Sequence, residues 1–118
     1  MLVDTSAWLE YFQGTSRGRS VRDVVDGGEI LYTTPIILAE LTSKSIRTDG
    51  VAKAEERVRF VLERTVHLPM DDALGIEAGR IHADKKRDFS DFGLADAFIQ
   101  AAANARGIKV LSFDPHLA

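Results

Sequence analysis

Short apolar runs alternate with helix-type patterns along the sequence, and this alternation most constrains how the chain can fold. The runs are of strand length, whereas the segments between them repeat apolar residues every three or four positions, as amphipathic helices do. Strands are therefore expected at residues 2–4, 30–33, 66–68 and 109–112. Strands that alternate with helices predict an α/β fold with a mainly parallel sheet of about four strands, joined by right-handed crossovers.

Six helices are expected around these strands. The third has the clearest beginning, because Thr34 can cap it and Pro35 suits the first helical position. Gly14 and Gly107 stand where the first and last helices should end. The expected helices are residues 7–12, 19–25, 35–46, 51–64, 71–87 and 94–106. Residues 1–118 have the length of one ordinary domain, and we expect a single domain over this range.

Composition excludes several classes of site. The sequence has no cysteine, which removes disulfides, thiolate zinc sites and a cysteine nucleophile, and fits a cytosolic protein. It opens with no signal pattern, and no apolar run approaches the ~20 residues of a membrane helix. The net charge of -3 weighs against nucleic-acid binding. A metal site built from carboxylates would itself be acidic, however, and a bound divalent cation would reverse the local sign.

Two of the expected strands run into an aspartate. Asp4 ends the first strand and Asp114 follows the last, so both should lie at the carboxyl edge of the sheet, where open α/β folds bind ligands. The alternative for Asp4 is to cap the next helix, and for Asp114 to form a turn with Pro115. Ser6 and Ser112 are the hydroxyl groups expected to support these carboxylates.

Two further acids lie on expected helices. Glu40 stands one turn from Ile36 in the most apolar part of its helix, where an unpaired charge would cost several kcal/mol. A metal ion would offset that cost better than the alternative, a surface ion pair with Lys44 worth about 0.3–0.5 kcal/mol. Asp96 lies in the first turn of the last helix, where interaction with the helix dipole is an equally good explanation. Together the four acids would form an all-oxygen site, which favours Mg²⁺ or Mn²⁺.

Other polar residues have weaker claims. Asp91 stands just before the last helix, and a cap or loop role is favoured over a role beside a metal ligand. The three histidines, His67, His82 and His116, show no metal-ligand spacing.

The sequence around the four acids resembles the PIN domain, and more narrowly the VapC-like toxins of bacterial and archaeal type II toxin–antitoxin pairs. The segments that carry the resemblance are Val3–Ala7, the helix around Glu40, Leu94–Ala103 and Leu111–Asp114. Two departures are visible. Ser112 stands where the family often has threonine, and the family usually continues past its last acid into a helix and a final strand. The sequence stops at Ala118, which leaves a fifth strand open.

The resemblance implies a three-layer α/β/α sandwich and a ribonuclease that depends on Mg²⁺ or Mn²⁺. It also implies a homodimer held inactive by a cognate antitoxin, which in the family binds a hairpin corresponding to residues 35–64. Single-stranded or looped RNA is the implied substrate, and Lys85, Lys86 and Arg87 are candidates for contacts with its backbone. The family's catalytic and metal-binding acids correspond to Asp4, Glu40, Asp96 and Asp114.

Three other readings compete with a nuclease. A phosphoacceptor receiver domain needs an acid after the third strand, where the sequence has Leu68 and Pro69. A haloacid-type phosphatase needs a second acid two residues after Asp4, where Ser6 stands. A non-catalytic binding module that kept the fold is compatible with the sequence, although the presence of all four acids argues against it.

Overall fold

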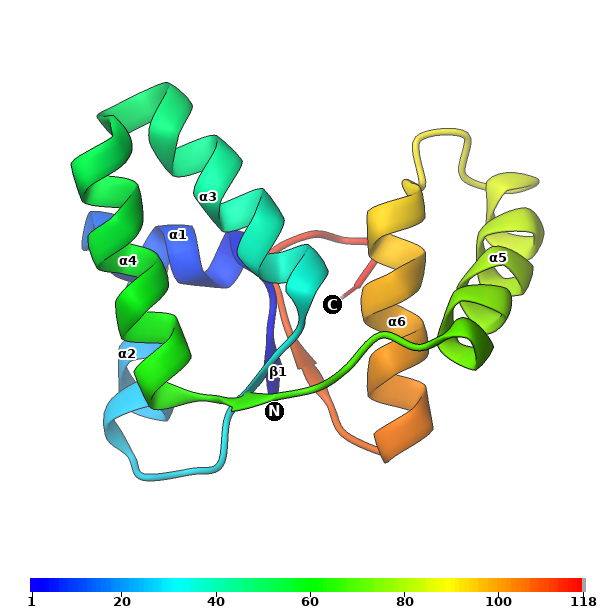
Figure 1. The fold of residues 1–118 in the computed structure, drawn as a ribbon, viewed down its shortest axis with the longest axis horizontal. Helices are drawn as coiled ribbons and strands as arrows, with labels where there is room; N and C mark the ends of the chain where they lie inside the picture. The colour runs from blue at the N-terminus through cyan, green and yellow to red at the C-terminus, as the bar shows by residue number, and fades with distance from the viewer. Residues whose placement is uncertain (118) are drawn as a thin grey trace.

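A parallel sheet of four strands organises the structure, a computed structural model that describes residues 1–117 (Figure 1). The strands are β1 (Leu2–Val3), β2 (Tyr32–Thr33), β3 (Val66–His67) and β4 (Val110–Leu111). Their order is β3-β2-β1-β4, and each neighbouring pair is parallel. The number and direction of the strands are as expected, although each strand is shorter. Because β2 and β4 lie on opposite sides of β1, the carboxyl ends of β1 and β4 form the topological switch point.

Helices cover both faces of the sheet, which confirms the three-layer architecture. Figure 1 shows α1 to α4 to one side of the strands and α5 and α6 to the other. Thr34 caps the third helix by accepting a hydrogen bond from the Ile37 N–H at 3.4 Å, as expected. Gly14 and Gly107 end the first and last helices with φ angles of 66° and 63°, which favour glycine. The bounds are α1 (Thr5–Gln13), α2 (Gly18–Asp26), α3 (Pro35–Asp49), α4 (Val51–Arg64), α5 (Asp72–Lys86) and α6 (Leu94–Arg106).

Two apolar clusters hold the layers together, and α6 contributes to both. The larger cluster packs α1, α2 and α3 against the strands around the fully buried Trp8. Ala102 and Ala103 of α6 join it, whereas Ala97 and Ala101 face a smaller cluster between α5 and α6 that contains Phe92. The small side chains let α6 lie close to the sheet and to α5 at once, which places its first turn firmly at the end of the sheet.

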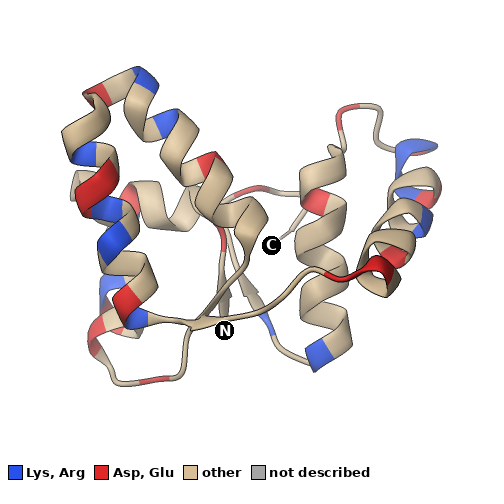
Figure 2. Ribbon diagram, in the orientation of Figure 1, with Lys and Arg blue, Asp and Glu red and all other residues tan. Residues whose placement is uncertain are grey.

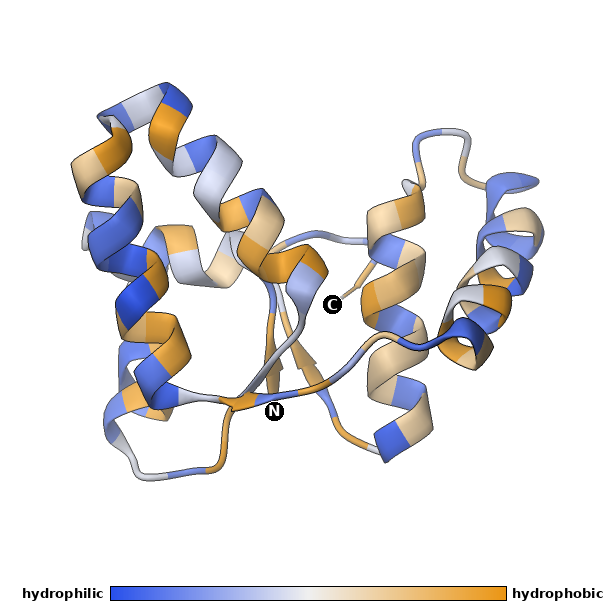
Figure 3. Ribbon diagram, viewed as in Figure 1, coloured by the Kyte–Doolittle hydropathy of each residue, from blue (hydrophilic) through white to orange (hydrophobic). Residues whose placement is uncertain are grey.

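The apolar line along α4 is only partly buried. Ala54 and Val61 are buried, but Val51 and Leu62 are 56% and 40% exposed, and Ile46 on α3 is 41% exposed. Figure 3 shows apolar bands along both helices of the α3–α4 hairpin. One side of the line packs within the chain, and the other side faces solvent.

No helix within residues 1–117 combines the length and the apolarity that crossing a membrane requires.

Candidate active site

Asp4 is buried at the carboxyl end of β1 and is held by two serines. Its Oδ2 accepts hydrogen bonds from Ser6 Oγ at 3.1 Å and from Ser112 Oγ at 2.8 Å, and the two hydroxyls lie 3.1 Å apart. The register of the first and last strands, which pairs Val3 with Leu111, brings Ser112 opposite Asp4. Asp4 occupies the N-cap position of α1 but makes no side-chain capping bond. Its carboxylate is therefore directed to the serines rather than to the helix.

Asp114 lies at the same end of the sheet as Asp4, two residues beyond Ser112. Its backbone N–H donates to Ser112 Oγ at 2.9 Å, and its Oδ1 accepts from the backbone N–H of His116 at 2.9 Å. The second bond closes a tight turn, so Asp114 does form the turn that was the alternative to a role in the site. Ser112 thus contacts both Asp4 and Asp114, which joins the two strand-end acids through one hydroxyl.

Glu40 reaches the same region from α3. Its Oε1 accepts a hydrogen bond from Thr5 Oγ1 at 3.1 Å, and Thr5 directly follows Asp4. Within the described residues Glu40 forms no ion pair with Lys44, which was its alternative partner. Glu40 is half-buried, so its charge lies against protein rather than in open solvent.

Asp96 lies in the first turn of α6. Its Oδ2 accepts from the Gly93 N–H at 3.2 Å, so it does interact with the helix N-terminus as the alternative explanation required. Figure 2 shows acidic bands on α3 and α6 across from each other at this end of the sheet. The helix-end role and a place among the other acids are therefore compatible.

The four carboxylates affect one another electrostatically. Burial raises the pKa of Glu40, and the negative charges of Asp4 and Asp96 raise it further, against the Thr5 hydrogen bond and the charge of Lys44. Burial likewise raises the pKa of Asp96, and the charges of Asp114 and Asp4 add to this effect. Crowded carboxylates of this kind are costly to keep ionised without a cation.

The chemistry of these donors fits a hard divalent cation, although their present arrangement is open. Among residues 1–117, no three His, Cys, Asp or Glu side chains already stand close enough together to hold one ion. Glu40 is turned to Thr5 and Asp4 to its serines, so binding a shared ion would require these side chains to rotate. Carboxylate oxygens are the donors that such an ion prefers, and its charge would offset the repulsion among them.

The basic residues proposed for RNA contacts differ in their environments. Lys85 Nζ lies over the Phe92 ring, 5.1 Å from its centroid, and Arg87 forms an ion pair with Asp84. Lys86 is exposed. Two of the three side chains thus already have a partner within the chain.

Sequence reasoning missed three contacts around the acids. The first is the hydrogen bond by which Thr5 holds Glu40. His116 pairs with Asp91, and the Arg17 guanidinium lies over the Phe113 ring at 4.4 Å from its centroid. Each contact joins segments far apart in the chain, and no local pattern of residues signals such a pairing.

Comparison with known proteins adds a family and a fold. A family model described as PIN domain matches residues 1–118. The structure is similar to VapC20 of Mycobacterium tuberculosis, a sarcin–ricin loop cleaving toxin, with a TM-score of 0.80 and 21% identity over 96% of this chain and 88% of that one. It is also similar to VapBC2 of Rickettsia felis bound to a promoter DNA fragment, with a TM-score of 0.75 and 13% identity over 98% and 93%.

A third similar structure is VapBC-1 of nontypeable Haemophilus influenzae, with a TM-score of 0.74 and 16% identity over 96% of this chain and 85% of that one. The comparison with curated proteins gives no significant match. At these identities the solved structures establish the shared fold.

Proposed function

The chain belongs to the PIN domain family, and on this premise we propose that it is a metal-dependent ribonuclease acting as the toxin of a type II toxin–antitoxin pair. The observation that carries the proposal is the placement of four acidic residues at the carboxyl end of the sheet, where Ser112 joins the two strand-end acids and Thr5 joins Glu40 to the residue after Asp4. The charges of neighbouring acids also raise the pKa values of Glu40 and Asp96. The similar folds of a VapC toxin and of VapBC complexes support the toxin assignment. A homodimer acting in the cytoplasm is part of the same proposal.

In this proposal Asp4, Glu40, Asp96 and Asp114 hold one or two Mg²⁺ or Mn²⁺ ions. When bound, such ions make a water molecule easier to deprotonate and offset the charge of a phosphodiester under attack. The chain's own groups fix the donors: Ser6 and Ser112 hold Asp4, Thr5 holds Glu40, and the Gly93 N–H holds Asp96. These hydrogen bonds hold the carboxylates near the end of the sheet before an ion binds, and Asp4 and Glu40 would turn from these partners to share the ion.

RNA is the substrate that the family favours, and its backbone would meet basic side chains near the acids. We retain Lys85, Lys86 and Arg87 as candidates, with Lys86 the most available because the others already contact Phe92 and Asp84. Such contacts position a nucleic acid without reading its sequence.

Removal of metal tests the enzymatic proposal directly. The purified protein is expected to cleave total RNA with Mg²⁺ or Mn²⁺, to lose this activity in EDTA, and to regain it when excess Mn²⁺ is added back. Sequencing the new RNA ends would identify the target. Cleavage that persists in EDTA would contradict metal dependence. A parent protein that neither cleaves RNA nor releases or absorbs heat on Mn²⁺ titration would favour the non-catalytic module.

The α3–α4 hairpin supports an antitoxin partner. A groove of 410 Å³ runs along it, and its walls combine exposed apolar residues with the charged rim residues Glu55 and Arg59. An apolar groove of this kind suits the apolar face of a partner helix. The apolar residues lining it are Ile46, Val51, Ala54, Val58 and Leu62.

Leu62→Asp is expected to weaken binding of the cognate antitoxin by at least about 10-fold, because it places a charge in the apolar groove. Co-expression measures this effect: the antitoxin should restore growth with the parent protein but not with the variant. Ile76→Asp is the matched control, since Ile76 is also exposed but lies on α5, away from the groove. If the antitoxin restores growth equally with both variants, the antitoxin does not bind this groove.

A further inference from the structure

Asp91 and His116 connect the loop before α6 to the turn after β4. His116 Nε2 lies 3.1 Å from Asp91 Oδ2, and the hydrogen bond from His116 lowers the pKa of Asp91. The His116 side chain is only 18% exposed, whereas that of Asp91 is 79% exposed. The more buried partner therefore belongs to the C-terminal turn, and the loop closes over it from outside.

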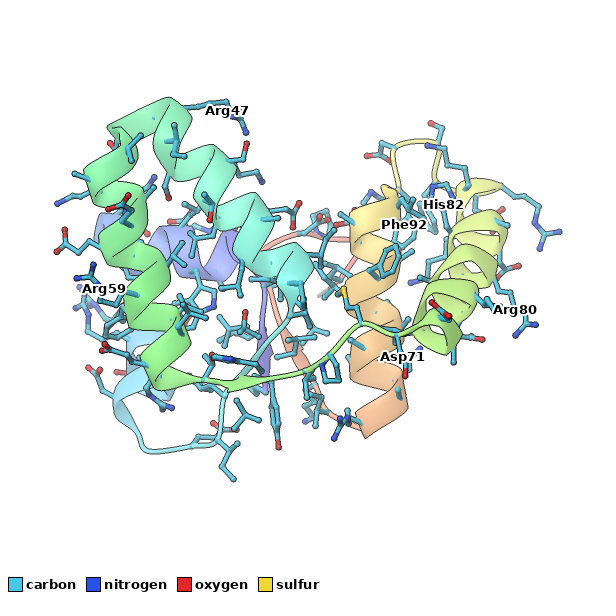
Figure 4. The ribbon with its side chains drawn as sticks, viewed as in Figure 1. Arg47, Arg59, Asp71, Arg80, His82 and Phe92 are labelled. Carbon is cyan, nitrogen blue, oxygen red and sulfur yellow. The ribbon has the colours of Figure 1, made fainter. Side chains whose placement is uncertain are left out.

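Aromatic packing fixes the His116 ring against the same loop. Its centroid lies 5.4 Å from that of Phe89 and 5.8 Å from that of Phe92, in edge-to-face arrangements. Phe92 is fully buried and lies between α5 and α6 (Figure 4). The ring thus contacts three residues of the loop, and one of them is anchored in the smaller apolar cluster.

Each end of this connection leads to one of the four acids. The backbone N–H of His116 donates to Asp114 Oδ1 at 2.9 Å. On the other side, Asp91 is followed by the anchored Phe92 and then by Gly93, whose N–H donates to Asp96 Oδ2 at 3.2 Å. The Asp91–His116 contact therefore lies between the segments that carry Asp96 and Asp114.

These two segments carry charges that repel each other, because the charge of Asp114 acts on Asp96. The turn that holds Asp114 follows a strand of only two residues, and hydrogen bonds of Ser6 and Ser112 tie its beginning to the Asp4 segment rather than to α6. A contact that ties this turn to the start of α6 would oppose the repulsion.

We propose that Asp91 and His116 are positioning residues that hold the Asp96 and Asp114 carboxylates near each other before a divalent cation binds. The inference rests on the proposed function, since it assigns these two residues to the assembly of the same site. Neither residue contacts the ion in this proposal. They lower the cost of bringing the carboxylates together, so they act on metal affinity more than on the reaction itself.

Mn²⁺ titration of the full chain by calorimetry tests the proposal with four single variants and the Asp91→Ala/His116→Phe double variant. Asp91→Ala removes the acceptor, and His116→Phe removes the donor but keeps a ring against Phe89 and Phe92. Asp91→Asn keeps an oxygen acceptor and should rescue binding. Asp88→Ala removes an equal charge from the same exposed loop and controls for the loss of negative charge alone.

Asp91→Ala and His116→Phe are each expected to weaken Mn²⁺ binding by about 10-fold, the lower end of the effect of groups that orient metal ligands. The double variant should be within about 2-fold of either single variant, because both remove one interaction. Asp91→Asn and Asp88→Ala should stay within about 2-fold of the parent. At saturating Mn²⁺ the kcat and the KM for RNA should approach parent values, which a general loss of structure would not allow.

Parent-like Mn²⁺ binding by Asp91→Ala would overturn the proposal, as would an equal loss in Asp88→Ala or a parent chain that binds no Mn²⁺. The midpoint of thermal unfolding of each variant separates a positioning role from a role in folding. If Asp91→Ala is already unfolded at the temperature of the titration and binds Mn²⁺ weakly for that reason alone, the positioning role is also contradicted. A parent that binds Mn²⁺ with the expected pattern but cleaves no RNA would refute the ribonuclease while leaving the positioning role supported.

Discussion

Asp4→Asn is expected to reduce RNA cleavage by about 100- to 1,000-fold without unfolding the protein. Asparagine keeps the shape of the side chain, and its oxygen can still accept the hydrogen bonds from Ser6 and Ser112. The substitution removes one charge from the site proposed to hold a cation, which would contribute several kcal/mol to the reaction. Since each 1.36 kcal/mol changes a rate tenfold, a loss of two to three such steps corresponds to about 100- to 1,000-fold.

Single-turnover cleavage of a defined RNA in saturating Mn²⁺ measures this effect, with circular dichroism as the check on folding. Asp23→Asn is the matched control, because Asp23 is an exposed aspartate on α2, outside the site. Asp96→Asn provides an independent variant from another helix and should show a comparable loss. A parent-like rate in either site variant would remove these acids from the reaction.

The second large effect concerns stability in the absence of metal. Asp96→Asn is expected to raise the free energy of unfolding of the metal-free protein near pH 7 by about 0.5–2 kcal/mol, because it removes a charge crowded by Asp114 and Asp4. For a domain of this length, the midpoint of thermal unfolding should rise by roughly 2–8 °C. The amide oxygen of the substituted side chain can still accept the hydrogen bond from the Gly93 N–H, so the start of α6 is preserved.

The same crowding of charge predicts how the stability of the metal-free protein changes with pH. The pKa values of Glu40 and Asp96 are raised in the folded state, so the folded chain takes up protons at a higher pH than the unfolded chain does. Their destabilising contribution is complete above the folded pKa values and disappears as the pH falls to the ordinary carboxyl range. The groups facing them are Asp4, Asp114, Lys44 and His116.

With bound metal, we expect the parent protein to become more stable than Asp96→Asn, which reverses their order in the metal-free state. Mn²⁺ at about 100 times its dissociation constant adds about 2.7 kcal/mol to the parent, and it should add much less to Asp96→Asn. Thermal unfolding near pH 7 and at mildly acidic pH, with EDTA or with Mn²⁺, measures all of these quantities. A metal-free Asp96→Asn chain less stable than the parent would show that the carboxylates are not in conflict.

The sequence predicted most of the architecture, because its signals were local. Thr34, Gly14 and Gly107 define helix ends through backbone preferences that do not depend on the rest of the chain. The positions of Asp4 and Asp114 followed from one further rule, that parallel strands deliver their carboxyl ends to one edge. The functional roles of these acids stay predictions that the proposed experiments test.

The contacts that sequence reasoning missed depend on the packing of irregular segments. Thr5 meets Glu40, and Asp91 meets His116, only after the helices have been placed around the sheet. The exposure of Val51 and Leu62 could not be predicted either. An apolar face on a helix predicts that something packs against it, but not whether that partner belongs to the same chain.

The pairing of β1 with β4 has a consequence for the newly made polypeptide. Asp4 is synthesised 108 residues before Ser112, whose hydroxyl holds the Asp4 carboxylate, and Asp114 follows two residues later. A chain that has not yet been extended to Ser112 and Asp114 therefore lacks two of the groups around Asp4, however well its earlier helices fold. If the proposed ribonuclease needs all four acids, its site can form only after the α3–α4 surface proposed to bind the antitoxin has already been made.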